Sequence, residues 1–315
     1  MINFPTKKAI DLPPQGSWPK SVHRFDPRSA NALNAAIAAQ RPLLVRGNPG
    51  TGKSQLARAA AQYLGRLFVT EVVHARAESQ DLQYHFDAVG RLGEAQALGA
   101  ACRTEKDEIK DCLEPRRFLA PGALWWVFNW QTACEQSEFT RFKHRKPERP
   151  PGWEAADKGS VLLIDEIDKA DADLPNGLLE TLGNGGFTVP YLDDPVCMQH
   201  KVVPPPLVVI TTNEERELPD AFLRRCLVLH LYLPDEDPEY RDKPEDVKQE
   251  ALAAYLIKRG QDHFPEMEKE VLAEAASQLW QDRNAARRHG ITPPGMAEYI
   301  DLLRAVEELG SNLAE

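Results

Sequence analysis

Eight consecutive residues have the types and spacing that bind a chain of phosphates. They read Gly47-Asn48-Pro49-Gly50-Thr51-Gly52-Lys53-Ser54 and match the pattern G-x-x-x-x-G-K-S. Glycines let successive backbone N–H groups turn toward one anion, and a helix N-terminus adds partial positive charge. Lys53 can reach the β and γ phosphates, and the Ser54 hydroxyl can ligate Mg²⁺. We therefore predict that these eight residues contact a nucleotide and that Ser54 is a metal ligand.

Acidic and amide side chains follow two apolar runs later in the chain. Asp165 and Glu166 come directly after the run 161–164, and Asn213 follows the run 207–210. In open α/β sheets, ligands bind just outside the carboxyl ends of the strands, so we expect these residues to meet at one crevice. Asp165 is predicted to hold Mg²⁺ through water, and Glu166 to polarise the attacking water. Asn213 is predicted to orient that water or to sense the γ phosphate.

The elements around these residues predict an α/β fold. Apolar runs are typical of buried parallel strands, and Ala/Leu-rich stretches between them indicate helices, one of which ends at Gly65. We predict a P-loop parallel-sheet core sandwiched by helices, with a small all-α lid domain after it. The expected strands are 42–46, 67–73, 161–164, 207–210 and 227–233. The expected helices are 29–40, 55–64, 123–130, 173–182 and 218–226. Residues 187–191 and 201–203 are expected to form a β-hairpin.

Composition shifts along the chain predict four segments. Residues 1–28 are rich in Pro and polar side chains and are expected to be an arm that lies on the body. Residues 29–233 form the predicted nucleotide-binding domain. Residues 234–246, with seven acids and three prolines, are the predicted hinge. The rest, 247–315, has helical periodicity and is the predicted lid domain.

The overall composition narrows the class of protein and its compartment. Of the 315 residues 42% are hydrophobic and 27% charged, and no apolar run approaches the roughly 20 residues that span a bilayer. The beginning of the chain has no signal-peptide pattern, and the five cysteines form no C-x-x-C pair. We expect a cytoplasmic protein with reduced thiols. The net charge of −10 argues weakly against a general affinity for nucleic acid.

Two segments leave alternatives open. The helix expected at 123–130 carries three tryptophans, which indicates either core or subunit packing, or a grip on a partner chain. The segment 139–153 is basic and contains aromatic residues, which is typical of either a solvated surface loop or a nucleic-acid contact.

The order of the motifs resembles that of AAA+ ATPases, and of the MoxR-type family in particular. The matching features are the phosphate loop, the Ile164-Asp165-Glu166 and Thr211-Thr212-Asn213 strand ends, and the run from Leu218 to Cys226, followed by a helical domain. One feature departs from that family, because the turn Thr292-Pro293-Pro294-Gly295 lacks the arginine often found there. Arg287 or Arg288 could substitute for it.

The resemblance implies an ATP-hydrolysing ring, expected to be a hexamer. Arg225, with Arg224 beside it, would reach the neighbouring subunit's site and stabilise charge on the transferred phosphoryl group. The alternative is that these arginines only complement the helix dipole. MoxR-type ATPases commonly act on partners with a von Willebrand factor A-like domain, so the resemblance implies a chaperone or remodelling role on such a protein client. The second hypothesis is a motor subunit of a DNA-acting restriction or defence system, supported by the basic segment 139–153. The residues leave the choice between ATP and GTP open.

Overall fold

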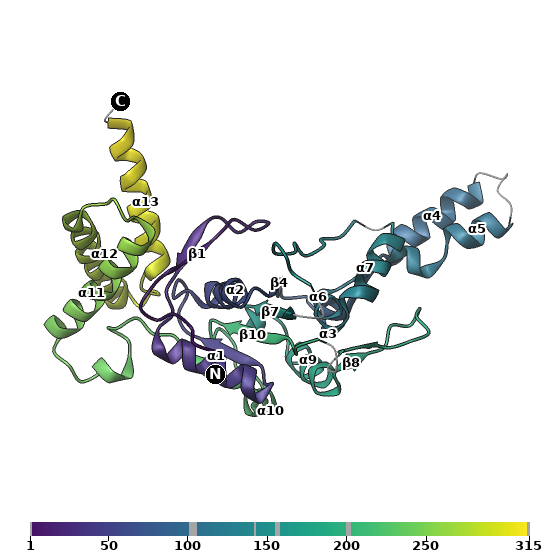
Figure 1. Ribbon diagram of the computed structural model, residues 1–315, viewed down its shortest axis with the longest axis horizontal. Helices are drawn as coiled ribbons and strands as arrows, with labels where there is room; N and C mark the ends of the chain where they lie inside the picture. The colour runs from purple at the N-terminus through teal and green to yellow at the C-terminus, as the bar shows by residue number, and fades with distance from the viewer. Residues whose placement is uncertain (1, 101–105, 142, 155–157, 200–202, 314–315) are drawn as a thin grey trace.

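A five-stranded parallel sheet forms the centre of the protein (Figure 1). A computed structural model describes residues 2–100, 106–141, 143–154, 158–199 and 203–313. The strand order is β11-β3-β10-β7-β4, and every neighbouring pair is parallel. The strands are β3 (Leu43–Arg46), β4 (Leu67–Val72), β7 (Ser160–Asp165), β10 (Leu207–Thr212) and β11 (Leu227–His230).

The apolar runs of the sequence become strands that are buried on both faces. Alternate residues of β7 pack into different clusters, so Val161 and Leu163 contact one layer of helices and Leu162 and Ile164 contact the other. The first layer contains α1 (Pro27–Ala39) and α2 (Lys53–Leu64). The second contains α6 (Ala123–Phe128), α9 (Asp173–Asn184) and α10 (Asp220–Arg225). The predicted sandwich of helices around a parallel sheet is therefore confirmed.

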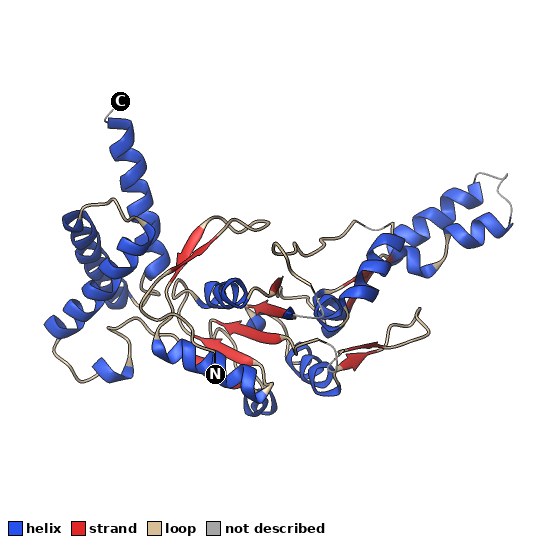
Figure 2. Cartoon of the chain, in the orientation of Figure 1, coloured by secondary structure: helices blue, strands red, loops and turns tan. Residues whose placement is uncertain are grey.

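Three helices at the C-terminal end pack around a core of their own. They are α11 (Glu245–His263), α12 (Lys269–His289) and α13 (Met296–Leu313), and they lie beyond one end of the sheet (Figures 1 and 2). Leu252, Leu272 and Leu303 are fully buried between them. The guanidinium of Arg283, on α12, donates to the carboxylate of Asp235 at 2.9 Å, and both side chains are buried. This ion pair fixes the segment 234–246 against the lid helices.

The first 28 residues contain more structure than an extended arm. β1 (Ile10–Leu12) and β2 (Ser21–His23) pair as an antiparallel hairpin. Arg58 of α2 is buried and donates to the carbonyl of Pro19 at 3.0 Å, which holds the hairpin on the body. Helix α1 begins at Pro27, before the predicted start at 29, because the Asp26 side chain accepts from the N–H of Ser29 and caps it.

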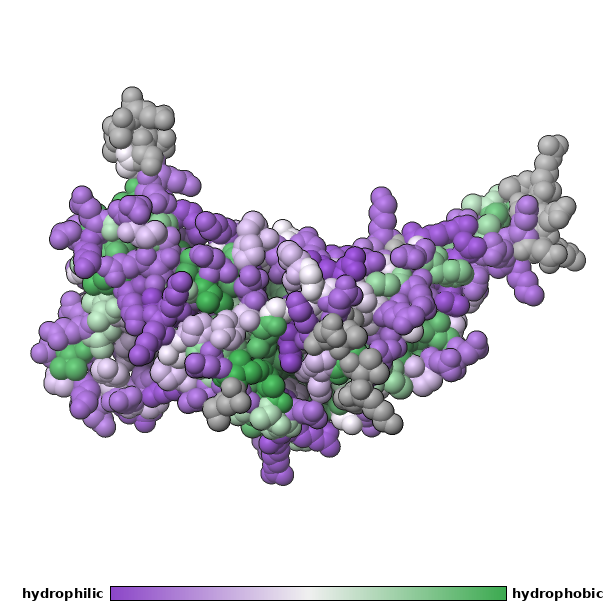
Figure 3. Space-filling view, in the orientation of Figure 1, coloured by the Kyte–Doolittle hydropathy of each residue, from purple (hydrophilic) through white to green (hydrophobic). Residues whose placement is uncertain are grey.

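A long insertion lies between β4 and β7 and projects from the other end of the sheet (Figure 1). Its outer part is a pair of helices, α4 and α5. The insertion consists of α3 (Ser79–Gln83), β5 (Tyr84–Phe86), α4 (Ala88–Ala100), α5 (Lys106–Cys112), β6 (Leu119–Pro121), α6 and α7 (Trp130–Phe139), with β5 and β6 antiparallel. Hydrophilic side chains cover much of the lid helices, whereas hydrophilic and hydrophobic side chains are mixed over α4–α5 (Figure 3). Val89 and Leu92 of α4 are exposed.

Two sequence predictions about local structure are wrong. The aromatic helix ends at Phe128 rather than continuing to Trp130, because Asn129 leaves the helical conformation and caps the next helix. The partner of β8 (Gly186–Phe187) is β9 (Val196–Cys197), not the predicted arm 201–203. Of that arm, residues 201 and 202 lie outside the described residues.

The tryptophan-rich segment lies in the core. Trp125 and Trp126 are 1% and 3% exposed and pack in the cluster that lies against β7 and β10. Trp153, from the end of the basic segment, is also buried there and contacts Trp130 edge to face. This arrangement favours the packing interpretation. Among the described residues, no helix is long and apolar enough to cross a membrane.

Candidate nucleotide site

The glycine-rich segment forms a tight turn between β3 and α2. Gly47, Gly50 and Gly52 all have positive φ angles. At Gly47 a side chain is excluded by space as well, because a Cβ would lie 2.4 Å from the carbonyl oxygen of Leu231. Helix α2 begins at Lys53 without a side-chain cap, so its first N–H groups are available to a ligand.

Lys53 is buried within this turn. Its Nζ donates to the carbonyl oxygens of Gly47 at 2.7 Å and Asn48 at 3.0 Å. Burial lowers the pKa of Lys53, and the nearby carboxylates of Asp165 and Asp168 oppose that shift. The turn thus holds an ammonium group beneath the glycines, at the end of the sheet where a phosphate chain would lie.

Ser54 and Asp165 meet directly, although 111 positions separate them. The Ser54 hydroxyl donates to the Asp165 carboxylate at 2.8 and 3.0 Å. Thr211, at the end of β10, donates to the same carboxylate at 2.5 Å. Both predicted metal ligands therefore share one position, and Thr211 fixes the orientation of the carboxylate.

Glu166 and Asn213 also lie together. The Asn213 amide donates to Glu166 Oε1 at 3.3 Å, and Lys169 Nζ contacts Glu166 Oε2 at 2.5 Å. Glu166 has a φ of 61°, an uncommon conformation for a residue with a side chain, and its N–H donates to Thr211 Oγ1. The hydrogen bond to Glu166 raises the pKa of Lys169.

Asp168 positions the segment that carries Asn213. Its carboxylate is buried and accepts from the backbone N–H of Asn213 at 3.4 Å and of Glu215 at 2.9 Å. These hydrogen bonds join the segment after β7 to the segment after β10. A buried carboxylate with backbone donors is costly to remove, so Asp168 stabilises this geometry.

Two adjacent cavities open beside these residues. The first, here called the loop cavity, has a volume of about 460 Å³, and its walls include Lys53, Ser54, Asp165, Glu166 and Asn213. The second, the lid cavity, has a volume of about 520 Å³ and lies between the N-terminal hairpin, the end of β11 and helix α11. The two cavities share the wall residues Val22, His23, Gly52, His263 and Met296.

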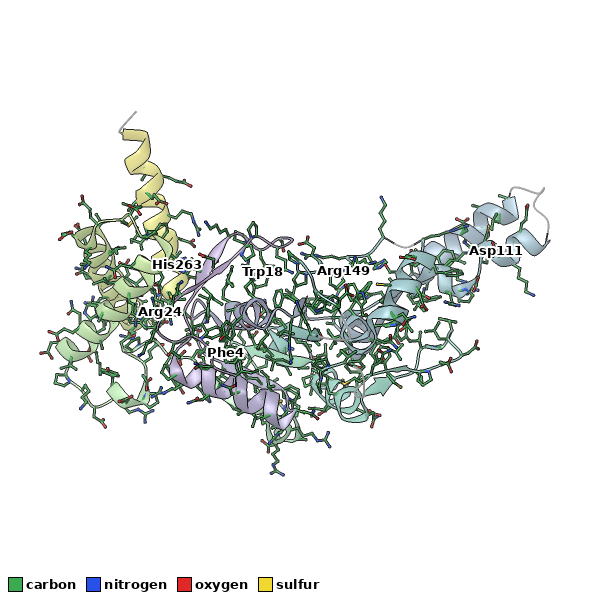
Figure 4. All side chains as sticks on the ribbon, viewed as in Figure 1. Phe4, Trp18, Arg24, Asp111, Arg149 and His263 are labelled. Atoms are coloured by element: carbon green, nitrogen blue, oxygen red, sulfur yellow. The ribbon has the colours of Figure 1, made fainter. Side chains whose placement is uncertain are left out.

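The lid cavity has aromatic and charged walls, with Arg28, Asp237 and Arg259 among the charged residues. His230 and Tyr232 stack within it with ring centroids 5.6 Å apart. His23 Nε2 is buried and has no hydrogen-bond partner in the described part of the chain. Burial, Arg259 and His263 lower the pKa of His23 to about 3, so its ring is neutral at pH 7. Figure 4 shows Arg24 of the hairpin next to the lid, where it pairs with Asp262 at 2.6 Å.

The lid helices contact the glycine-rich turn. The N–H of Ala297, in the first turn of α13, donates to the carbonyl of Gly50 at 3.2 Å. Arg304 of the same helix lines the loop cavity. Arg287, considered from the sequence, instead pairs with Asp235, and Arg288 donates to a carbonyl of its own helix. Neither of these two lines a cavity of the site. Two other lid arginines do, Arg304 in the loop cavity and Arg259 of α11 in the lid cavity.

Arg224 and Arg225 do not join the site of their own chain. They are exposed at the end of α10, and neither lines the two cavities. Arg41 donates to the backbone carbonyl of Arg225 at 3.0 Å and so fixes the end of α10. Within the described residues, neither arginine side chain has a hydrogen bond or an ion pair.

The residues present suit a triphosphate with Mg²⁺. Gly47 leaves a cradle that a Cβ would fill, and a buried ammonium lies next to it. A hydroxyl and a carboxylate lie side by side, which is the oxygen ligand set that Mg²⁺ takes together with water and phosphate. Among the described residues, no group of three or more His, Cys, Asp or Glu side chains could hold a metal by themselves.

Sequence reasoning missed three contributors to the site. Thr211 lies at a predicted strand end, but its role depends on β10 lying next to β7 in the sheet. Lys169 follows Glu166 by three positions, and only the turn after β7 brings the two together. Arg304 is one of many basic residues in helical segments, and no local signal separates it from the others.

Comparison with known proteins places the core of the chain in one family. The sequence pattern of the AAA domain (dynein-related subfamily) matches residues 42–226, more than half of the chain. A solved structure of a candidate ATPase from Cytophaga hutchinsonii is similar, with a TM-score of 0.38 and 14% sequence identity. That match covers 80% of this chain and 57% of the other chain. No curated protein matches the sequence.

Proposed function

Because the chain belongs to the AAA domain family, dynein-related subfamily, we propose that it is an ATPase that hydrolyses Mg-ATP in the loop and lid cavities. The observation that carries the proposal is the meeting of four groups from three segments that are distant in the sequence. Lys53, Asp165, Glu166 and Asn213 line one cavity from three different segments. A purely structural glycine turn would not require acids from β7 and an amide from β10 at the same place.

In this proposal each residue has one task. The N–H groups of the 47–54 turn and the Lys53 ammonium bind the phosphate chain. A bound Mg²⁺ would supply positive charge to the phosphate oxygens, and Ser54 and Asp165 are the residues that would hold it. Glu166 accepts a proton from the attacking water, and Asn213, bonded to Glu166 Oε1, orients that water.

Lys169 and the lid cavity complete the proposed site. The ammonium of Lys169 contacts Glu166 Oε2 at 2.5 Å and holds the carboxylate in position beside Asn213. The lid cavity takes the base and ribose, with the stacked His230 and Tyr232 in its wall. Competition between ATP and GTP for binding to the full chain measures which base this cavity prefers.

Two substitutions in the purified full chain test this function. Lys53→Ala should abolish binding of a fluorescent ATP analogue. Glu166→Gln should keep binding but lower turnover by about 10²- to 10⁴-fold, because the proton acceptor is lost. Glu180→Gln makes the same chemical change at an exposed position of α9 and serves as the control. Turnover of the Glu166→Gln protein within a few fold of the control would refute the assignment of Glu166.

The proposal includes a ring in which Arg225 completes the neighbour's site, with Arg224 beside it. The support is its position, since it is exposed on α10, away from the site of its own chain. A guanidinium supplied across the interface would stabilise charge on the transferred phosphoryl group. Hydrolysis would then depend on assembly. A hexamer is the expected ring.

The finer role that we propose is a MoxR-like chaperone or remodelling ATPase. The contact of Ala297 with Gly50 joins the lid to the nucleotide turn, so hydrolysis would be transmitted to the lid helices. A protein client, with a von Willebrand factor A-like domain as in the MoxR-type resemblance, is the expected recipient of that motion. Stimulation of ATPase activity by the client, and insensitivity to DNA, would support this role over a DNA-acting motor.

A further inference from the structure

In the part of the chain that the structure describes, one edge of the central sheet has no partner strand. β4 is the last strand in the order, and among the described residues it pairs with β7 alone. The direction of its backbone groups follows from two hydrogen bonds at its ends. The N–H of Leu67 donates to Gly159 at 3.2 Å, and that of Val73 donates to Asp165 at 2.9 Å. The odd-numbered residues therefore direct their N–H and C=O groups toward β7.

The even-numbered residues of β4 must then direct their N–H and C=O groups away from β7, because the backbone groups of successive strand residues alternate in direction. These residues are Phe68, Thr70 and Val72. No described residue hydrogen-bonds to their outward N–H or C=O groups. The hydroxyl of Thr70 also lacks a partner within the described residues. Such a row of unpaired groups is a template for another strand.

A cavity lies along this edge. Its volume is about 330 Å³, and one wall consists of the four consecutive residues 68–71 of β4. The opposite walls come from the N-terminal hairpin with Trp18 and from the basic loop 143–148. At about 3.3 Å per residue, the strand wall is long enough for an extended stretch of three to four residues. Figure 4 shows Trp18 and Arg149, a residue next to that loop, on the same side of the sheet.

The charges at the rim favour an acidic partner. Lys143 and Arg145 are exposed, line the cavity, and have no ion-pair partner among the described residues. The carboxylate of Glu148, which also lines the wall, accepts a hydrogen bond from the N–H of Gly16 at 3.2 Å. The remaining carboxyl group is that of Glu71, which is half-buried and has no described hydrogen-bond partner. Cations beside an open edge repel basic strands and attract acidic ones.

We propose that the open edge of β4 binds an extended acidic peptide segment, which adds to the sheet as a sixth strand with its acidic side chains against Lys143 and Arg145. The site is separate from the nucleotide site and does not depend on hydrolysis there. Main-chain hydrogen bonds to Phe68 and Thr70 supply affinity, and the two cations supply selectivity. An acidic segment of a client protein has the chemistry that this edge recognises.

The first test is a binding measurement with defined probes. An eight-residue fluorescein-labelled peptide that alternates glutamate and threonine should bind the full chain, as measured by fluorescence anisotropy. The same peptide with lysine in place of glutamate should not bind. A version with proline at its central positions should bind at least about tenfold more weakly, since proline lacks the N–H that pairs with a strand edge.

Substitutions in the basic loop test the role of charge. The double variant Lys143→Glu/Arg145→Glu should weaken binding of the acidic peptide by at least about tenfold. Arg149→Glu reverses one positive charge nearby, at a position outside this cavity, and should keep affinity within about threefold. Both variants alter exposed side chains outside the nucleotide site, so ATP binding serves as the check that they fold.

Hydrogen exchange resolved to single amides gives the decisive pattern. Saturating acidic peptide should slow exchange at Phe68 and Thr70 at least about tenfold and leave Val69 and Glu71 unchanged, because the N–H groups of Val69 and Glu71 already face β7. No binding at 1 mM peptide, or binding without this alternation, would overturn the proposal. Binding of a single-stranded oligonucleotide to the basic loop, with no change at β4, would assign the loop to nucleic acid and also overturn it.

Discussion

The stability of this protein should depend on pH through one carboxyl group, Glu71. Burial raises the pKa of Glu71 from 4.5 to about 7, and the nearby carboxylate of Asp81 adds to the shift. The perturbation is the substitution Glu71→Gln, which keeps the size of the side chain and removes its charge. The charged form is disfavoured only in the folded protein. The substitution should therefore raise the free energy of unfolding most at pH values at which Glu71 would be ionised.

The magnitude follows from the two pKa values. Below pH 4.5 the group is protonated in both states and has no effect on folding. As pH rises from 4.5 toward 7 the unfolded chain ionises first, so the folded protein loses stability, and the loss is complete above pH 7. At about 1.4 kcal/mol per unit the full loss is about 3 kcal/mol, and the part between pH 5 and pH 8 is about 2 to 3 kcal/mol.

The assay is urea unfolding of both proteins at pH 5 and at pH 8. The free energy of unfolding of Glu71→Gln, relative to the natural chain, should rise by about 2 to 3 kcal/mol between these pH values. Asp81→Asn removes the second cause of the shift and should reduce the pH dependence of the natural chain. If the difference between the Glu71→Gln protein and the natural chain were the same at both pH values, the reasoning from burial would be refuted.

Three further outcomes are expected. Arg225→Ala should bind ATP normally and lose turnover. Mixing it with Lys53→Ala should restore part of the activity, because the Arg225→Ala protein supplies the intact nucleotide site and the Lys53→Ala protein supplies the arginine. No recovery at any mixing ratio would count against a shared site. Asp168→Ala leaves the N–H groups of Asn213 and Glu215 without their acceptor, so it should cost about 1 to 3 kcal/mol in urea unfolding and also slow hydrolysis, and a change in neither would remove the positioning role. Thr70→Val removes a buried hydroxyl without a described partner, so the variant should unfold at equal or higher urea concentration, and a loss above about 1 kcal/mol would reveal a hydrogen bond there.

Local chemistry made the core of the fold predictable. The runs that became β3, β7 and β10 are apolar and continuous, as strands buried on both faces must be. Gly65 ends α2 in a left-handed conformation, which glycine adopts at little cost. The secondary structure of the insertion between β4 and β7 was harder to predict from the sequence, because its short elements are stabilised by packing against the body. Its strands β5 and β6 pair across a separation of more than 30 residues, and no turn signal connects them.

The sequence by itself determined which groups can bind phosphate and metal: a glycine turn, Lys53, Ser54, and acids that follow an apolar run. These depend on residue type and on spacing over a few positions, which local sterics and helix geometry translate directly into shape. Only the tertiary structure decided which distant groups join them. Thr211 reaches Asp165 because β10 lies beside β7, and Arg304 enters the loop cavity because α13 packs on the turn. The open edge of β4 is likewise a property of strand order, since the same six residues in the middle of the sheet would have no backbone group left to bind a partner.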